Sequence, residues 1–250
     1  MEGSKDRKPN DTQPFLPSFL QSCNPAILQS CNAYDHPVVP AIILAAGQST
    51  RMGRLKPNLP LQGTSGTETF LTRIVRMFME AGVDDIVVVV GHEKDAVLDK
   101  FSESHLRVRF VENPDYASGQ LTSLLAGLRV VDRPGVVATL CTPVDVPFTS
   151  SATTRTVLER YRETHAPIVR PTNAGRHGHP LLIDRTVFDP LRRADVTAGA
   201  RPVVRKYASA AGDVEVDDVG AFLDVDTPED YVEAIRIFDR GDRADRGHAE

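Results

Sequence analysis

The residues best suited to bind an anion lie together in one segment, Leu44-Ala-Ala-Gly-Gln-Ser-Thr-Arg-Met-Gly-Arg-Leu-Lys-Pro57. Small residues at positions 45–47 allow backbone N–H groups to approach a bound group closely. Arg51, Arg54 and Lys56 add positive charge, and an arginine can bind a phosphate through two parallel hydrogen bonds. The segment therefore predicts a phosphate-binding loop, although an ordinary turn with solvated basic residues would have a similar composition.

Two common phosphate-binding motifs do not fit this segment. The P-loop pattern G-x-x-x-x-G-K-[ST] fails because Gly47 and Gly53 are one residue too far apart and Arg54 follows the second glycine. The dinucleotide-binding pattern G-x-G-x-x-G does not occur in the segment either. A different kind of nucleotide or phosphate site is indicated.

Carboxylates follow two apolar segments elsewhere in the chain. Asp145 lies in Cys141-Thr-Pro-Val-Asp-Val-Pro-Phe148, and Asp224 and Asp226 lie in Phe222-Leu-Asp-Val-Asp-Thr-Pro-Glu-Asp-Tyr231. Mg²⁺ prefers oxygen ligands, commonly one or two carboxylates together with substrate phosphates. The alternatives are a turn aspartate between two prolines and, for the second segment, the start of a helix.

Two polar stretches are candidates for substrate contact. In Asn113-Pro-Asp-Tyr-Ala-Ser-Gly-Gln-Leu-Thr-Ser123, Gly119 permits close approach, and Gln120 and Ser123 could meet a base or ribose. A polar loop that caps the following helix is an equal alternative.

The second stretch, Gly175-Arg-His-Gly-His-Pro180, contains two histidines, and His179 could act as a base. That role is disfavoured because a phosphate acceptor is already ionised at neutral pH. Arg201 and Arg205 are weaker anion candidates, since exposed helix charges explain them equally well.

Alternating strand and helix patterns place these segments at the ends of strands. Continuous apolar runs predict strands, and the ranges are 38–44, 86–90, 108–111 and 136–141, with short ones at 167–170, 181–183 and 221–224. Helical spacing predicts helices, and the ranges are 70–78 (stopped by Gly82), 95–101, 121–128, 151–164 and a last one from Thr227. This alternation predicts an α/β fold with one doubly wound, mainly parallel sheet, in which ligands bind beyond the carboxyl ends of the strands.

The composition excludes several classes of function. The net charge is −5, 41% of the 250 residues are hydrophobic, and no apolar run is long enough to cross a membrane. These values argue against nucleic-acid binding by the whole surface and against a membrane partner. Three cysteines do not form a disulfide framework, so we expect a reducing compartment and a cytoplasmic location.

The two ends of the chain differ from the middle. Residues 1–37 are polar and repeat the sequence Leu-Gln-Ser-Cys-Asn, and residues 239–250 alternate arginines with acids, so we expect disordered tails around one domain at 38–238. Cys23, Cys31 and His36 do not have the spacing of a zinc finger and are one ligand short.

The first segment resembles the signature of the MobA-like NTP transferase family, a branch of the nucleotidyltransferase superfamily. The family pattern is LAAGxSxRMGxxK, and its fixed positions correspond to Leu44, Ala45, Ala46, Gly47, Ser49, Arg51, Met52, Gly53 and Lys56. Within the family, the LAAG start is similar to that of the molybdenum cofactor cytidylyltransferases, which favours CTP. The Asp145 segment departs from the family, which usually has Asp-Gln-Pro where this chain has Asp-Val-Pro.

The resemblance implies a role for each candidate residue. Arg51, Lys56 and Asp145 would be catalytic, and Asp145 with Asp224 would bind Mg²⁺, with Asp226 as a rival ligand. The implied nucleotide-binding residues are Leu44, Ala45, Ala46, Gly47, Ser49, Arg51, Gly53, Lys56, Gly119, Gln120 and Ser123. The acceptor side would be formed by His177, Gly178 and His179.

The implied reaction is Mg²⁺-dependent transfer of a nucleoside monophosphate, most simply CMP from CTP, onto a phosphorylated small molecule such as the molybdopterin cofactor. Pyrophosphate would be released, and a partner enzyme could receive the product. A sugar-phosphate nucleotidylyltransferase that uses UTP or another triphosphate is the first alternative. The second is a nucleotide-binding chaperone without turnover, against which the two retained carboxylates argue.

Overall fold

The computed structural model describes residues 37–61 and 68–246, with side chains described as far as Phe238. The predicted N-terminal tail lies, except for its last residue, outside the described residues, as do Cys23, Cys31 and His36. In the described part, no helix combines the length and the apolar character that crossing a membrane requires.

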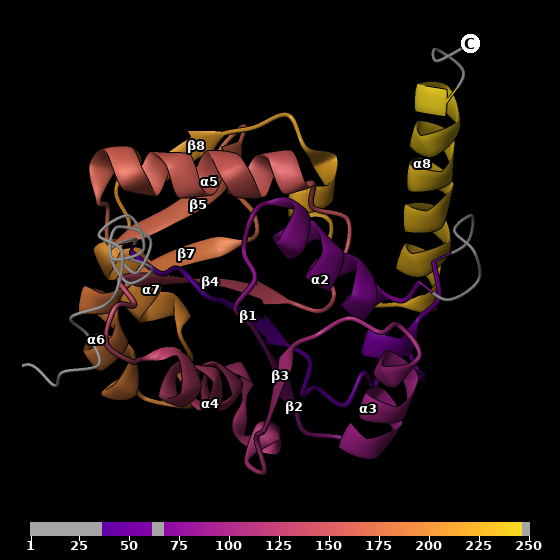
Figure 1. Ribbon diagram of the computed structural model, residues 1–250, viewed down its shortest axis with the longest axis horizontal. Coiled ribbons are helices and arrows are strands. Elements are labelled where there is room, and N and C mark those ends of the chain that lie inside the picture. The colour runs from indigo at the N-terminus through magenta and orange to yellow at the C-terminus, as the bar shows by residue number, and fades with distance from the viewer. Residues whose placement is uncertain (1–36, 62–67, 247–250) are drawn as a thin grey trace, which may run out of the picture. The chain divides into compact units, whose positions relative to one another are not determined.

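The strands form one mixed sheet in the order β3-β2-β1-β4-β7-β5-β6, and β8 pairs with β5 (Figure 1). Their bounds are β1 Ala41–Leu44, β2 Ile86–Val90, β3 Arg109–Glu112, β4 Ala138–Pro143, β5 Ile168–Asn173, β6 Arg176–His177, β7 Leu181–Asp184 and β8 Asp213–Glu215. The first four are parallel, β4 and β7 are antiparallel, and β7 and β5 are antiparallel. The predicted fold class, an α/β fold with a doubly wound and mainly parallel sheet, is confirmed.

Helices cover both faces of the sheet, which explains why the strands are apolar throughout. The helices are α2 Phe70–Glu80, α3 Lys94–Ser102, α4 Gln120–Val131, α5 Ser151–Thr164, α6 Phe188–Arg192, α7 Arg201–Tyr207 and α8 Pro228–Arg246. In β1, Ile43 packs with α2, α3 and α5 on one face, whereas Ile42 packs with α4, α6 and α7 on the other. Successive strand residues thus contribute to two separate cores.

Local signals fix the helix ends that border the sheet. Thr69 and Thr72 form a reciprocal capping box at the start of α2, and Ser150 caps α5 through the backbone N–H of Thr153. After α2, Gly82 adopts a φ of +84°, a left-handed conformation that glycine adopts at little cost.

One predicted strand is wrong. Residues 219–222 form a 3₁₀ helix rather than the start of a strand at 221–224, and residues 223–226 continue outside any strand. Asp218 caps this turn by accepting a hydrogen bond from the backbone N–H of Gly220 at 3.0 Å. A Cβ on Gly220 would lie 2.0 Å from the carbonyl oxygen of Phe148, so this glycine allows the turn to pack against the chain after β4. The strand that pairs with β5 in this part of the chain is β8.

The last helix, α8, begins at Pro228 and ends at Arg246. It therefore extends into residues 239–250, for which the sequence predicted a disordered tail. Two ring contacts fix its first turns to the domain. Tyr231 lies against Phe70 at a centroid distance of 5.9 Å, and Phe238 stacks on Phe148 at 4.0 Å.

The sheet reverses its direction of winding between β1 and β4. The chain proceeds from β1 outward through β2 and β3, and then returns to place β4 on the other side of β1. Leu44 at the end of β1 is paired with Pro143 at the end of β4. The loops that follow these two strands therefore diverge from a common point, where open α/β sheets bind ligands.

Candidate functional site

A cavity of about 250 Å³ opens at the carboxyl ends of β1 and β4. Its walls come from the loop after β1, the start of α4, the loop after β4 and the segment before α8. The lining residues are Leu44, Ala46, Gly47, Ser49, Thr50, Arg51, Lys56, Tyr116, Gln120, Ser123, Pro143, Val144, Asp145 and Asp226. We refer to it as the loop cavity.

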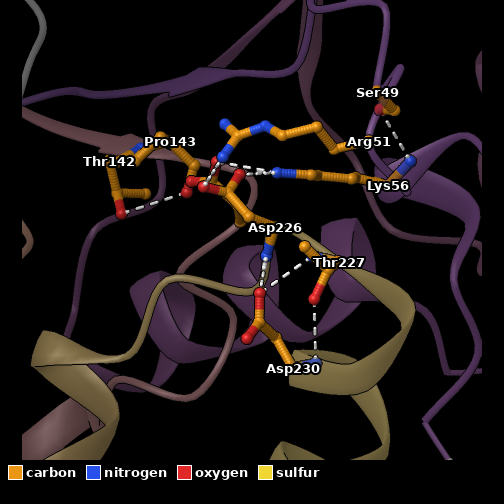
Figure 2. Close-up of polar contacts among 9 residues, drawn as sticks. Ser49, Arg51, Lys56, Thr142, Pro143, Asp226, Thr227 and Asp230 are labelled. Carbon is orange, nitrogen blue, oxygen red and sulfur yellow. Dashed lines mark hydrogen bonds and ion pairs between the residues drawn. The ribbon is translucent and has the colours of Figure 1, made fainter.

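Lys56 is the centre of an ion-pair cluster in the loop cavity. Its Nζ lies 3.1 Å from Oδ2 of Asp145 and 2.6 Å from Oδ1 of Asp226, and its side chain is only 10% exposed. Nη1 of Arg51 lies 2.9 Å from the other oxygen of Asp226. Figure 2 shows Arg51 and Lys56 running side by side toward Asp226. Three segments far apart in the sequence are thus joined by charge.

The position of Asp226 is set by the start of α8. Its backbone N–H and that of Thr227 both donate to Oδ2 of Asp230, at 3.1 and 2.9 Å (Figure 2). Asp230 also donates its backbone N–H to the hydroxyl of Thr227, which completes the cap. The hydrogen bond from Lys56 holds the pKa of Asp226 below its usual value, so this carboxylate is ionised at neutral pH.

Asp145 and the segment 224–226 are also joined through the backbone. The N–H of Val225, whose side chain is fully buried, donates to the carbonyl oxygen of Asp145 at 2.8 Å. Partial burial and the nearby negative charge of Asp145 raise the pKa of Asp224. Among the described residues, Asp224 forms no ion pair. Asp145 and Asp224 are therefore two close carboxylates, of which only the first has a cationic partner.

The loop after β1 is closed by its own backbone. The N–H groups of Met52 and Gly53 donate to the carbonyl oxygen of Ser49, and the Ser49 hydroxyl accepts from the N–H of Lys56 at 3.2 Å. Gly53 has a φ of +67°, which explains the glycine at this position. Ala45 donates its N–H to Val89, and its side chain lies in the core rather than on the cavity wall.

The wall formed by α4 is held by a buried asparagine. Asn113 is 3% exposed, and its amide nitrogen donates to the hydroxyls of Thr122 and Ser123 at 2.9 and 3.0 Å. Gly119, at a φ of +114°, directly precedes α4 without lining the cavity, whereas Gln120 and Ser123 line it.

A second cavity of about 390 Å³ shares Leu44, Gln120 and Pro143 with the loop cavity. We refer to it as the arginine cavity. The predicted acceptor residues line it together with Asp224, and the full set is Leu44, Gln120, Leu121, Leu124, Cys141, Pro143, Arg170, Arg176, His177, Gly178, His179, Leu181, Ile183, Ala200, Arg201, Val204, Arg205, Ala221, Phe222 and Asp224. The two cavities are therefore adjacent, with the carboxylates at their boundary.

Two groups in the arginine cavity are unsuited to acid–base or nucleophilic work. Burial lowers the pKa of His179 despite the nearby Asp224 and Asp145, so its imidazole is a weaker base than an exposed histidine, and its Nδ1 is buried without a hydrogen-bond partner among the described residues. Burial raises the pKa of the Cys141 thiol to about 12, so it is not a thiolate at neutral pH.

The structure thus brings together most of the residues singled out in the sequence, in two cavities rather than one. Gly53 and Gly119 shape the backbone from outside the cavity walls, and Asp224 lies in the arginine cavity. Sequence reasoning did not single out Thr50, Tyr116 or Val144. The ring of Tyr116 packs against Gly91, just after β2, and no local sequence pattern predicts that contact.

The carboxylates at this site fit a metal ion that takes some of its ligands from the protein and the others from a bound substrate. Within residues 37–61 and 68–246, no group of three or more His, Cys, Asp and Glu side chains is arranged to hold a metal ion. Two adjacent carboxylates are nevertheless the usual protein contribution to a Mg²⁺ site that phosphate oxygens complete. Asp145 and Asp224 provide such a pair.

Comparison with known proteins places the chain in a family. Residues 41–211 match the MobA-like NTP transferase domain. The chain belongs to the MobA-like NTP transferase family, and it is an enzyme of the nucleotidyltransferase class, as the sequence predicted.

Several relatives cover the same part of the chain. It is 27% identical to the molybdenum cofactor cytidylyltransferase of Escherichia coli K12, over 78% of this chain and 95% of that one. It is 30% identical to the molybdenum cofactor guanylyltransferase of Rhodopseudomonas palustris BisB5, over 84% and 98%. The crystal structure of Rv0371c from Mycobacterium tuberculosis H37Rv superposes with a TM-score of 0.65 at 27% identity, over 80% of this chain and 98% of that one, and a manganese complex of the same protein is also similar.

Proposed function

We propose that this enzyme transfers CMP from CTP to a phosphorylated small-molecule acceptor, such as a molybdopterin cofactor, and releases pyrophosphate. The observation that carries the proposal is the juxtaposition in the loop cavity of a cationic loop, through Arg51 and Lys56, with the carboxylate of Asp145. The LAAG start of the loop, with Ala46 on the cavity wall, supports CTP as the donor. The cytidylyltransferase relative supports the same choice.

The triphosphate would bind along the loop after β1. Its β- and γ-phosphates would lie against the backbone of residues 46–50 and accept hydrogen bonds from Arg51 and Lys56. The nucleoside would extend toward Gln120 and Ser123, the polar residues on the α4 side of the cavity. In this arrangement the α-phosphate lies near Asp145, at the boundary with the arginine cavity.

Asp145 and Asp224 would hold Mg²⁺, which would neutralise charge on the α-phosphate and on the leaving pyrophosphate. The pKa of Asp224, raised by partial burial and then by the negative charge of Asp145, supports this assignment, because a bound cation would stabilise the ionised carboxylate against both. Asp226 is the weaker ligand candidate, since Arg51 and Lys56 already compensate its charge. The manganese complex of the similar protein Rv0371c agrees with a divalent cation.

In the reaction, an oxygen of the acceptor phosphate attacks the α-phosphorus and forms a new P–O bond. The bond from the α-phosphorus to the oxygen that bridges it to the β-phosphate breaks, and pyrophosphate leaves with the bonding electrons. No general base is required because the acceptor phosphate is already ionised, which agrees with the lowered pKa of the buried His179, a weaker base than an exposed histidine. The protein's contribution is alignment of the two phosphates and stabilisation of charge by Arg51 and Lys56.

The test is a thermal unfolding panel with CTP, GTP, UTP and ATP, each with Mg²⁺ or EDTA. A triphosphate at about one hundred times its Kd adds about 2.7 kcal/mol, which corresponds to about 5–10 °C in Tm for a chain of this size. We expect a Mg²⁺-dependent shift that is largest for CTP. A larger shift with UTP or GTP would keep the transferase and overturn the CTP assignment.

Turnover is then tested by pyrophosphate release with candidate acceptors. The Asp145→Asn variant should lose at least about 100-fold in rate while its Tm without ligand changes little. CTP binding without pyrophosphate release from any phosphorylated acceptor would favour the nucleotide-binding chaperone.

A further inference from the structure

The four arginines of the arginine cavity fall into two pairs. Nε of Arg170 donates to Oδ1 of Asp213 at 2.7 Å, and Nη2 of Arg176 donates to the carbonyl oxygen of Phe222 at 2.8 Å. Arg201 and Arg205 differ, because neither side chain forms an ion pair or hydrogen bond within the described part of the chain. The cavity therefore contains two guanidinium groups whose donors are not used by the protein.

Their spacing brings these two guanidinium groups to one place. Arg201 and Arg205 are four residues apart in α7, so they lie on the same side of the helix, one turn from each other, and both line the cavity. Like charges at this spacing repel each other. A bound anion between them would remove that repulsion and would accept hydrogen bonds from both.

The part of the lining beside α7 is apolar, whereas Gln120, His177, His179 and Asp224 supply polar groups elsewhere in the cavity. Val204, between the two arginines, belongs to the same hydrophobic cluster as Leu121, Leu124, Leu181 and Ile183, all of which line the cavity. This wall offers few hydrogen-bond partners to the hydroxyl groups of a sugar. It suits a carbon skeleton that is apolar or aromatic.

We propose that Arg201 and Arg205 bind the phosphate of the acceptor, and that the acceptor is a phosphate monoester whose apolar or aromatic body lies on the wall formed by Leu121, Leu124, Leu181, Ile183 and Val204. This assignment rests on the proposed nucleotidyl transfer and names the acceptor class for it. Leu44, Gln120 and Pro143 border both cavities, so a ligand held by α7 meets the nucleotide at the boundary where Asp224 lies.

The experiment measures binding of two phosphate monoesters while the loop cavity is filled. The α,β-methylene analogue of CTP, with Mg²⁺, occupies the loop cavity without being cleaved, and phenyl phosphate or glycerol 1-phosphate is then titrated by calorimetry. The variants are the double substitution Arg201→Gln with Arg205→Gln and, as matched control, Lys206→Gln. The Lys206→Gln substitution removes one positive charge from the same helix, but Lys206 does not line the cavity.

We expect wild type to bind phenyl phosphate about tenfold or more tightly than glycerol 1-phosphate, because only the phenyl ring buries apolar surface. The double variant should bind phenyl phosphate at least about tenfold more weakly than wild type, whereas Lys206→Gln should change the affinity less than about twofold. A double variant that binds as Lys206→Gln does would overturn the arginine assignment. Equal or tighter binding of glycerol 1-phosphate would overturn the apolar acceptor.

The two proposals fail in distinguishable ways. Analogue binding to wild type is measured first, and its absence would overturn the nucleotidyl transfer together with the acceptor assignment. Normal analogue binding combined with arginine-independent binding of the esters would overturn only the acceptor assignment. The Tm of each variant without ligand is compared with that of wild type, so that a folding defect is not read as a loss of binding.

Discussion

Replacing Lys56 by methionine tests the charge cluster on which the loop cavity depends. The substitution keeps most of the buried apolar stem and removes the ammonium group that lies 3.1 Å from Asp145 and 2.6 Å from Asp226. A hydrogen bond to a charged group contributes about 1.5–3 kcal/mol, and exposure of both carboxylates reduces the sum of the two. We expect a loss of about 2 kcal/mol in the free energy of unfolding at pH 7, or about 4–8 °C in Tm.

The same variant should bind CTP with Mg²⁺ about 10–100-fold more weakly, because one charge-assisted contact to the phosphates is lost. Its Tm deficit should be smaller in Mg²⁺ than in EDTA, since the metal restores positive charge beside Asp145. Calorimetry and thermal unfolding give both values. The control is Arg54→Gln, which removes an exposed charge from the same loop but none from the cavity wall.

The pH dependence of this deficit has a definite sign. Lys56 lowers the pKa of Asp226 in the folded protein, so the stabilisation is fully present above the unfolded carboxyl value of about 3.9 and is lost as the pH falls through the folded value. The stability difference between wild type and the Lys56→Met variant should therefore be constant from pH 6 to 8 and disappear in acid. A Lys56→Met variant with the Tm and CTP affinity of wild type would refute the proposed role of the cluster.

Three further substitutions test separate parts of the structure. Asp226→Asn should raise triphosphate affinity in EDTA about fivefold by calorimetry, because the carboxylate no longer competes with the phosphates for Arg51 and Lys56. Weaker binding by this variant would contradict that competition. Asp132→Asn should cost about 1 kcal/mol in urea unfolding at pH 7 and progressively less as the pH falls below about 3.9, since Arg192, 2.6 Å away, lowers the pKa of Asp132 and the benefit is lost as the pH falls through that lowered value. Gly220→Ala should cost about 2–3 kcal/mol, because its Cβ would lie 2.0 Å from the Phe148 carbonyl oxygen; a Tm like that of wild type would contradict this packing.

The fold was predictable where the sequence pattern and the tertiary environment agree. The apolar runs of β1, β2 and β4 are buried on both faces, and the helical spacing of α2 and α5 ends at capping residues that can be read locally. The strand expected at 221–224 failed because a contact distant in sequence determines the backbone there. Gly220 packs on the chain after β4, and that neighbour is invisible in the local pattern.

The candidate site was predictable in its residue types and less so in its pairing. The signature segment gave Arg51 and Lys56, and the carboxylates were found from their positions after apolar runs. The sequence pattern does not show which carboxylate Arg51 and Lys56 contact. That pairing depends on the path of the chain between the 3₁₀ helix at 219–222 and α8. The sequence left Arg201 and Arg205 only as weaker anion candidates, because only the packing of α7 shows that both line one cavity.

In the proposed function, Asp224 and Asp226 have separate roles at the boundary of the two cavities. Asp226 compensates the charges of Arg51 and Lys56 and holds both side chains on the wall of the loop cavity. A triphosphate bound as we propose would have to displace this carboxylate, so Asp226 would keep the loop in place at some cost in affinity. Asp224 lines the other cavity without an ion-pair partner in the described part of the chain, and partial burial and the negative charge of Asp145 raise its pKa. A divalent cation that arrives with the triphosphate would find Asp145 and Asp224 as its carboxylates, while the cations released from Asp226 become available to the phosphates. Metal and nucleotide binding should therefore be coupled, each improving the affinity for the other.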